Sequence, residues 1–387
     1  MTSPATAATT SPAPIAFIDL AAQRARIGRR IDDAVQAVLA SCRYINGPEV
    51  AEFEAQLAAF AGAKHAISCA SGTDALALLL MAWGVKAGDA VFCPAFTFCA
   101  TAEVVPWVGA TPVFVDVKED TFNMDPESLD QAIKVAIEQG LEPRVVIPVD
   151  LFGQPADYDA ILPVAEKYGL KVLCDTAQGF GATWNNKRTG SIGDATATSF
   201  FPAKPLGAYG DGGAILTDDA ELVAVLKSLR EHGQGVDKYQ NVRIGMTARL
   251  DTIQAAVLIE KLAIFEEEIA AREKVARRYS ALLKDVATVP VVDSRATSVW
   301  AQYTIRLAPG VRDGLAETLK AEGVPTAVYY RLPMHLQPAY RHYPSAGAIL
   351  PVCEMLAEEV ISLPMHAYLD EATQDRIVDA VKRGLQG

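Results

Sequence analysis

The chain has 387 residues, of which 50% are hydrophobic and 21% charged, so it can bury a large core and is not wholly disordered. Its length suits one large domain with a smaller one. A net charge of −12 at pH 7 argues against binding nucleic acid through a basic surface. No apolar run is long enough to cross a bilayer, so no membrane protein is expected.

The first residues and the cysteines bear on the cellular compartment. Residues 1–14 are rich in Ala, Thr, Ser and Pro and lack the basic start and apolar centre of an export signal. We interpret them as a disordered tail and expect a cytoplasmic protein. The six cysteines form no CxxC pair and the five histidines are scattered, so neither a disulfide framework nor a metal site is predicted. The cysteines are expected to be small buried hydrophobic residues in a reducing compartment.

Short apolar runs alternate with helical patterns between about residues 65 and 220. The runs predict strands at 66–71, 90–96, 111–117, 145–150, 171–177, 197–201 and 212–218. Several are apolar at nearly every position, as strands covered by helices on both faces are. Helical patterns such as residues 73–83 and 157–169 lie between them, and Gly169 is a typical helix end. This alternation predicts an α/β domain with a mostly parallel seven-stranded sheet.

The rest of the chain has a different pattern. A helical pattern over residues 250–283 is long enough to suggest one connecting helix between two domains. A strand pattern at 298–308 then mixes with helical patterns at 314–323, 351–362 and 370–385, which together indicate a smaller α+β domain. We therefore predict a large domain over residues 15–265, with a helical segment at its start, and a small C-terminal domain over residues 266–387.

Ligands of open α/β sheets bind beyond the carboxyl ends of the strands, and two segments at such ends carry polar groups. Residues 71–75 (SGTDA) run straight from a strand into a helix, where first-turn N–H groups suit a phosphate. An ordinary N-cap is an equally open interpretation of this segment. Asp175 closes an apolar strand, where a carboxylate needs a cation or hydrogen-bond donors. A helix cap is the commoner role for such an aspartate.

The most informative segment is residues 198–213, which contains Lys204. This lysine lies between two prolines, after two phenylalanines and before a Gly-rich turn. Most lysines are solvated surface residues, but apolar surroundings lower the pKa of the ammonium, as a Schiff-base nucleophile requires. The segment 94–98 (PAFTF) places an aromatic side chain at another strand end, either as plain core or as a stacking face for a ring.

Together these segments resemble the sugar aminotransferases of the DegT/DnrJ/EryC1/StrS family, which have fold type I of the pyridoxal-phosphate (PLP) enzymes. The resemblance covers residues 15–387. It is carried, in chain order, by FIDLAAQ, GPEVAEFEAQLAAFAGAKHAISCASGTDAL, GATPVFVDV, PVDLFGQPADYDAI, DTAQGFGA, SFFPAKPLGAYGDGGA, LREHGQ, RLDTIQAAVL and KL. It implies PLP as the cofactor and a homodimer with shared active sites.

The resemblance also implies roles for single residues around the cofactor ring. Lys204 takes the place of the lysine that bonds covalently to PLP. Asp175 would pair with the protonated pyridine nitrogen and keep the ring an electron sink. Gln178, where many relatives carry His, would hydrogen-bond the ring hydroxyl or stack near it, and Phe98 would stack on the ring.

Gly72, Thr73 and Ser199 resemble the phosphate cup of the family. Relatives usually complete this cup with an Asn from the partner subunit, in a G-x-N-x-R pattern. Here residues 245–249 read GMTAR, so Thr247 replaces the Asn. A threonine hydroxyl can donate a hydrogen bond but reaches less far, so this departure puts the partner's phosphate contact in doubt.

The implied reaction is a ping-pong transamination, in which L-glutamate gives the amino group, a nucleotide-linked keto sugar receives it and Lys204 moves the proton. The stretch SFFPAKPLGAYGDGG is closer to relatives that aminate C3 of UDP-2-acetamido-2-deoxy-3-oxo-glucuronate, for bacterial surface polysaccharides such as lipopolysaccharide. An arginine suits the planar carboxylate of that sugar. Arg249, grouped with Tyr329, Tyr330 and His335, is the candidate, and a structural ion pair at a subunit interface is the alternative for Arg249.

Four other functions stay open. The first is amination at C4 of a dTDP-, GDP- or UDP-linked 4-keto-6-deoxy sugar. The second is a PLP-dependent sugar dehydratase, in which His replaces the lysine, so Lys204 argues against it. The third is a non-catalytic regulatory protein, but the lysine, the aspartate and the Gln/His position are all kept. The fourth is a nicotinamide-dependent Rossmann enzyme, which needs a G-x-G-x-x-G after the first strand that this chain lacks.

Overall fold

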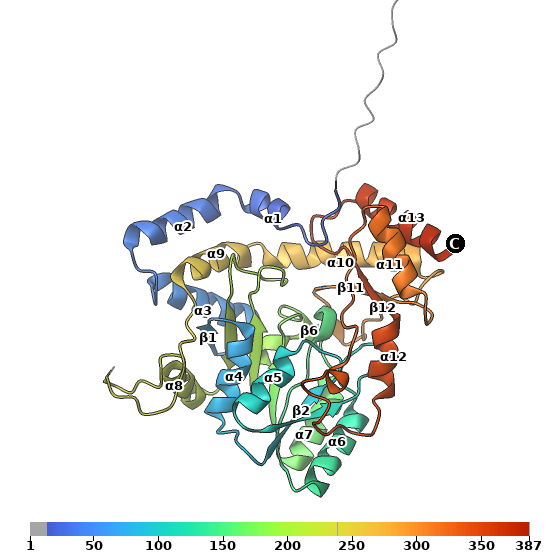
Figure 1. The fold of residues 1–387 in the computed structure, drawn as a ribbon. Coiled ribbons are helices and arrows are strands. Elements are labelled where there is room, and N and C mark those ends of the chain that lie inside the picture. The colour runs from blue at the N-terminus through green and yellow to red at the C-terminus, as the bar shows by residue number, and fades with distance from the viewer. Residues whose placement is uncertain (1–13, 238, 387) are drawn as a thin grey trace, which may run out of the picture.

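The computed structural model describes residues 14–237 and 239–386, and the statements below refer to these residues (Figure 1). The predicted disordered tail lies outside them, apart from Pro14. No helix in this part of the chain is both long and apolar enough to cross a membrane.

A seven-stranded sheet forms the centre of the molecule, in the order β1-β9-β8-β5-β4-β2-β3. Its strands are β1 (His65–Cys69), β2 (Asp89–Pro94), β3 (Thr111–Val115), β4 (Glu142–Val146), β5 (Lys171–Asp175), β8 (Ala195–Ser199) and β9 (Gly213–Thr217). Strand β9 is antiparallel to both of its neighbours, and every other pair in the sheet is parallel. The seven predicted strands and the mostly parallel sheet are therefore confirmed.

Helices cover both faces of this sheet. They are α3 (Pro48–Ala61), α4 (Gly72–Ala82), α5 (Ala100–Trp107), α6 (Pro126–Glu138), α7 (Tyr158–Tyr168) and α8 (Ala220–Leu229). In β2 the side chain of Phe92 packs in one buried cluster with α6 and α7, and that of Val91 in another with α4, α5 and α8. Because side chains alternate along a strand, a strand with two covered faces is apolar on both, as residues 90–94 of β2 are.

The expected connecting helix over residues 250–283 is wrong in one respect, because the structure has two helices there. Helix α9 (Thr252–Leu262) ends at Ala263, and α10 (Phe265–Leu283) begins two residues later. Ile264 and Phe265 are buried at the break. Three glutamates occupy the first turn of α10, where negative charge favours a helix start. The two helices lie nearly end to end across the upper part of Figure 1, below α1 and α2.

The C-terminal part forms its own apolar core between α10, α11 (Arg312–Ala321) and α13 (Glu371–Gln386). These helices pack around the antiparallel pair β11 (Tyr303–Arg306) and β12 (Val360–Leu363). The helical pattern at 351–362 was predicted too long, because α12 (Pro351–Glu359) ends where the β-branched residues of β12 begin. The domain boundary at residue 265 stays a prediction.

The remaining elements are short or lie at the chain start. Helices α1 (Leu20–Ile27) and α2 (Arg29–Ser41) precede the sheet, and α2 packs on α9. A small sheet has the order β10-β6-β7, formed by β10 (Ala296–Thr297), β6 (Thr183–Trp184) and β7 (Lys187–Arg188). Single 3-10 turns occur at η1 (Leu151–Gly153), η2 (Thr189–Ser191) and η3 (Met334–Leu336). The six cysteines are free thiols, four of them buried, with Cys42 exposed and Cys99 partly buried.

A buried ion pair ties α3 and α8 to the edge strand β1. Arg230 Nη1 donates to Glu54 Oε1 and to the carbonyl oxygen of Ser68, both at 2.7 Å. Glu54 Oε1 also accepts from the N–H and Oγ of Ser68, at 2.9 and 2.8 Å. The two charged side chains are only 11% and 13% exposed, so removal of one leaves the other buried without its counter-charge.

We predict that Arg230→Met lowers the free energy of unfolding by about 3 kcal/mol, because the Glu54 carboxylate loses its buried partner. The shift of the urea midpoint at fixed protein concentration measures the effect. Arg29→Met is the control, since Arg29 forms a 4.0 Å pair with Asp33 in which both side chains are exposed; its expected effect is below about 0.5 kcal/mol. Equal effects of the two substitutions would contradict the prediction.

Candidate active site

A cavity of about 440 Å³ lies at the carboxyl ends of β1, β5 and β8. This is the edge of an open α/β sheet at which ligands are expected. Nine of the predicted site residues line it: Gly72, Thr73, Phe98, Asp175, Gln178, Ser199, Lys204, Tyr329 and Tyr330. Residues from five separate stretches of the chain are thus brought together in one place.

The start of α4 forms one wall of this cavity. Ser71 is the N-cap of α4, and its Oγ accepts from the N–H of Asp74 at 3.0 Å, so the N-cap interpretation is confirmed. Gly72 and Thr73 follow in the first turn, where N–H groups have no acceptor within the helix. A Cβ on Gly72 would lie 2.7 Å from Cβ of Ser199, so glycine lets α4 approach β8 this closely. The N–H groups of this first turn can therefore bind an anion at the helix start.

Asp175 is a buried carboxylate in the cavity wall, only 6% exposed. Its Oδ2 accepts from Oγ1 of Thr101 at 2.9 Å, and its Oδ1 from the N–H of Ala177 at 3.1 Å. Burial raises the pKa of this carboxyl, while the two hydrogen bonds and the charge of Lys204 oppose the increase. A positively charged group in the cavity would therefore stabilise the ionised form.

Lys204 lies in a tight turn between β8 and β9, and its N–H donates to the carbonyl oxygen of Phe201 at 2.8 Å. The side chain lines the cavity, and its Nζ makes no hydrogen bond to any described residue. Burial lowers the pKa of the Lys204 ammonium, and the nearby charge of Asp175 opposes the decrease. The amine is therefore more readily deprotonated than a solvated lysine, as a nucleophile or a general base requires.

Gln178 is held by two contacts beside the cavity. Its Oε1 accepts from the N–H of Phe152 at 2.7 Å, and its Nε2 donates to the hydroxyl of Tyr330 at 3.2 Å. The two interpretations of the segment 94–98 are both found, at different residues. Phe96 is fully buried core, whereas Phe98 is 53% exposed and lines the cavity, so its ring is available for stacking.

Three predicted site residues do not line this cavity. Thr247 and Arg249 line a second cavity of about 420 Å³, and Asp211 lines both cavities. Arg249 Nη1 donates to Glu231 Oε2 at 3.0 Å, and its Nε is buried without a partner. His335 is buried, with its Nε2 at 3.1 Å from Glu354 Oε1.

The expected grouping of Arg249 with Tyr329, Tyr330 and His335 is therefore not found within one chain. Arg249 lies in the segment between α8 and α9 and lines the second cavity, which shares Asp211 with the Lys204 cavity. The two tyrosines come from the C-terminal part of the chain and reach that cavity directly.

The sequence analysis missed Thr101, Gln302 and Asp211, which also contribute to the site. Thr101 orients Asp175, and its hydroxyl lies 3.0 Å from that of Thr97, four residues earlier in the loop before α5. The four-residue spacing of these two threonines was the available signal. No local pattern pointed to Gln302, which lies in an ordinary strand sequence.

The residues present fit PLP. The glycine-lined start of α4 beside Ser199 suits its phosphate. The buried Asp175 carboxylate suits a protonated ring nitrogen, and the Lys204 amine with its lowered pKa suits an aldehyde. Among the described residues, no cluster of three or more His, Cys, Asp or Glu is arranged to hold a metal ion.

Comparisons with known proteins agree with this geometry. The model of the DegT/DnrJ/EryC1/StrS aminotransferase family matches residues 25–382. A UDP-2-acetamido-2-deoxy-3-oxo-D-glucuronate aminotransferase from Pseudomonas aeruginosa is 49% identical over 93% of this chain and 97% of its own length. A pleiotropic regulatory protein from Geobacillus stearothermophilus is 41% identical over 95% of this chain and 97% of its own. The crystal structure of a DegT DnrJ EryC1 StrS aminotransferase from Brucella abortus, 54% identical, matches with a TM-score of 0.93 over 95% of this chain and 99% of that one.

The Asp175–Lys204 interaction predicts a pH effect in the cofactor-free protein. Asp175→Asn removes the negative charge that opposes the lowered pKa of Lys204, so acetylation of Lys204 by acetic anhydride should begin at lower pH than in the unchanged protein. Mass spectrometry of the modified peptide over a pH series measures the midpoint. The exposed Lys86 is the internal control and should not respond to the substitution. An unchanged or higher midpoint for Lys204 would show that the two groups do not interact.

Proposed function

The chain belongs to the DegT/DnrJ/EryC1/StrS aminotransferase family, and we propose that it transfers the amino group of L-glutamate to C3 of UDP-2-acetamido-2-deoxy-3-oxo-glucuronate. It is a PLP-dependent aminotransferase of fold type I, and the named relatives of its family include a nucleotide-sugar enzyme. One observation carries the proposal: Lys204 and Asp175 face the same cavity beside a glycine-lined helix start.

Lys204 and Asp175 have complementary roles in this proposal. PLP, when bound, carries the amino group between the two substrates and draws electrons from the carbon that loses or gains a proton. Lys204 Nζ takes that proton and returns it, which its lowered pKa and free position allow. The Asp175 carboxylate, oriented by Thr101 and Ala177, keeps the ring nitrogen protonated.

Other residues of the cavity hold the cofactor. Gly72, Thr73 and Ser199 form the phosphate cup, where N–H and hydroxyl donors meet the positive end of α4. The exposed ring of Phe98 would stack on the heterocycle. Gln178, held by hydrogen bonds to Phe152 and Tyr330, would hydrogen-bond the ring hydroxyl.

A homodimer completes the site in this proposal. The segment between α8 and α9 projects from the body at the left of Figure 1 and exposes the apolar side chains of Val236, Val242 and Ile244. An exposed apolar patch of this kind is typical of a protein interface. Thr247 and Arg249 line a cavity outside that of Lys204, so in this proposal they reach the cofactor of a partner subunit across this surface.

Arg249 is the residue proposed to bind the sugar carboxylate. Its Nη1 donates to Glu231, whereas its buried Nε has no hydrogen-bond partner among the described residues. In this proposal Nε donates to the carboxylate of the sugar. The substrate also supports a cytoplasmic location, because nucleotide sugars are made there, and a place in surface polysaccharide synthesis.

The role of Lys204 is tested by Lys204→Ala. Transamination should fall by at least about 10³-fold, since the variant lacks both the amine that bonds to the cofactor and the group that moves the proton. Glutamate-dependent amination of the sugar, followed by chromatography, measures it. Lys86→Ala at an exposed position should leave turnover unchanged. Appreciable steady-state turnover by Lys204→Ala would refute the assignment.

The role of Arg249 is tested with two substrates that differ only in the carboxylate. Arg249→Gln should raise KM for the 3-oxo-glucuronate about 10- to 100-fold, because a charge-assisted hydrogen bond is lost. KM for the analogue with a hydroxymethyl group at this position should change less than about twofold.

Glu231→Gln is the matched control, because it breaks the same ion pair and keeps the arginine. If Arg249 has only a structural role, both variants will affect the two substrates alike. A panel of UDP- and dTDP-linked keto sugars completes the test, and a clear preference for a 4-keto-6-deoxy sugar would reject the uronate in favour of C4 amination.

A further inference from the structure

Gln302 has a side-chain amide in the wall of the active-site cavity that makes no hydrogen bond to any described residue. Its Oε1 is buried without a partner. A buried amide oxygen normally has a hydrogen-bond partner, because an unpaired one costs about 1–3 kcal/mol. The terminal torsion of a glutamine is broad, so the amide can turn to meet a polar group that enters the cavity. A ligand is the available partner.

The backbone at Gln302 is hydrogen-bonded to the loop that contains η1 (Leu151–Gly153), which we call the Phe152 loop. The N–H of Gln302 donates to the carbonyl oxygen of Phe152 at 3.3 Å, and the N–H of Val299 donates to that of Gly153 at 3.0 Å. Gly153 has φ of 108°, and a Cβ there would lie 2.7 Å from the backbone nitrogen of Trp300. The two backbones therefore approach as closely as only a glycine permits.

Both sides of this contact contain a non-glycine residue in the left-handed region. Phe152 has φ of 58° and Trp300 has φ of 50°. Such conformations persist where the surroundings enforce them, and they gather at binding sites. The surroundings here are specific: Arg272 Nη1 donates to the carbonyl oxygen of Trp300 at 3.1 Å, and the indole Nε1 of Trp300 donates to Glu273 Oε2 at 2.6 Å.

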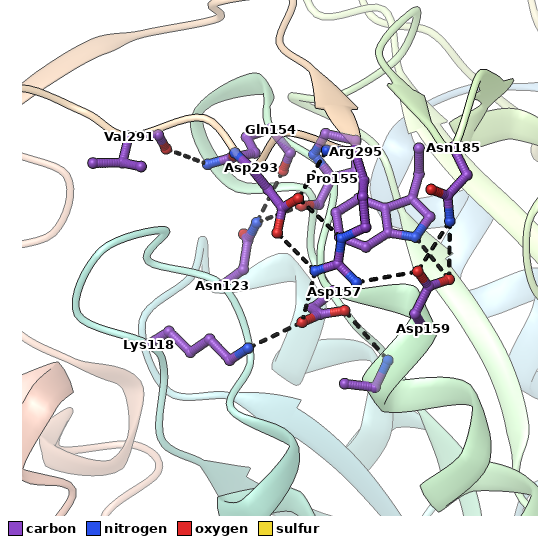
Figure 2. Close-up of polar contacts among 12 residues, drawn as sticks. Lys118, Asn123, Gln154, Pro155, Asp157, Asp159, Asn185, Val291, Asp293 and Arg295 are labelled. Atoms are coloured by element: carbon purple, nitrogen blue, oxygen red, sulfur yellow. Dashed lines mark hydrogen bonds and ion pairs between the residues drawn. The ribbon is translucent and has the colours of Figure 1, made fainter.

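The Phe152 loop is in turn anchored by the polar network in Figure 2. Asn123 Nδ2 donates to the carbonyl oxygens of Gln154 and Pro155, at 3.0 and 2.9 Å. Gln154 bonds through its amide to Val291 and Asp293 in the segment before β11, at 3.0 and 2.8 Å. Arg295 completes the network with ion pairs to three carboxylates, those of Asp157, Asp159 and Asp293.

This network holds the Phe152 loop between Gln178 and Gln302. The N–H of Phe152 donates to Oε1 of Gln178, which we assign to the cofactor, and its carbonyl oxygen accepts from the N–H of Gln302. One rigid loop thus sets the positions of two glutamines that line the same cavity. Both amide atoms of Gln178 have a partner within the chain, whereas neither amide atom of Gln302 has one among the described residues.

The chemistry of the cavity indicates what Gln302 binds. Lys204 is the one cationic side chain among the described residues that line it, and the aromatic rings of Phe98, Tyr329 and Tyr330 contribute much of the wall. A neutral amide both donates and accepts, which suits a hydroxyl or an acetamido group better than a carboxylate. Aromatic rings with a few fixed polar groups are typical of a wall that binds an uncharged organic group.

We propose that Gln302 is a specificity-determining residue that hydrogen-bonds a neutral polar group of the keto sugar, a ring hydroxyl or the acetamido group. The inference rests on the proposed function, because it needs a sugar acceptor in the same cavity. Glutamate, which presents two carboxylates and an ammonium group, is not bound by Gln302. The two halves of the reaction should therefore respond differently to a substitution of this residue.

The experiment measures each half-reaction separately by the absorbance of the enzyme-bound cofactor. Gln302→Leu, which keeps the approximate size and removes the amide, should raise the sugar concentration needed for half-maximal rate about tenfold. The half-reaction with L-glutamate should change less than twofold. Gln302→Asn keeps the amide on a shorter side chain and should have an intermediate effect. Gln131→Leu, at an exposed position of α6, is the matched control and should change neither half-reaction.

The outcomes separate this inference from the proposed function. If wild-type enzyme reacts with glutamate and with no keto sugar, the proposed function fails and the inference fails with it. If wild-type enzyme aminates the sugar and Gln302→Leu behaves like Gln131→Leu, only the inference fails. Equal slowing of both half-reactions would overturn it too, because that is the result of a general loss of structure or of cofactor. If Gln302→Leu does not fold, Gln302→Asn decides between these results.

Discussion

The site depends on the burial of one carboxylate and one amine at the same cavity. Away from water each charged form is destabilised, so burial raises the pKa of Asp175 and lowers that of Lys204, while each partly restores the charge of the other. Thr101 and Ala177 hold the carboxylate in place, but no described residue holds the amine. The Asp175 carboxylate is therefore a fixed anion that can pair with a protonated ring nitrogen. The Lys204 amine can move, and its lowered pKa allows it to react with an aldehyde and to accept a proton.

The rest of the fold brings these two groups together. Strand β5 ends at Asp175, and the neighbouring strand β8 leads into the turn with Lys204. The antiparallel strand β9 brings the chain back beside β8, so this turn remains at the carboxyl edge of the sheet. Glycine permits the close contacts, since a Cβ on Gly72 would meet Ser199 and one on Gly153 would meet Trp300. The shape of the cavity therefore depends on these close contacts at glycine as well as on the side chains that line it.

The sequence predicted the sheet well, because strands covered on both faces are largely apolar and helices alternate with such strands. It was less successful at the C-terminal side. The helical pattern continues through Ala263, so the break before α10 was missed, because it depends on the burial of Ile264 and Phe265 against other elements. Periodicity likewise extended α12 into residues that pair as β12. In both cases tertiary contacts outweighed the local preference.

For the site, the sequence by itself determined which residue types stand at the strand ends, and the environment of Lys204 between two prolines already indicated an amine of lowered pKa. It also determined the family, through motifs that occur in order along the chain. Only the tertiary structure decided which of these residues share a cavity. Thr247 and Arg249 line a different cavity from Lys204, whereas Thr101 and Gln302 joined the site although the sequence analysis had not singled them out. The physical reason is that a hydrogen bond or a cavity wall depends on distance in space, which sequence spacing specifies only within one helix or strand.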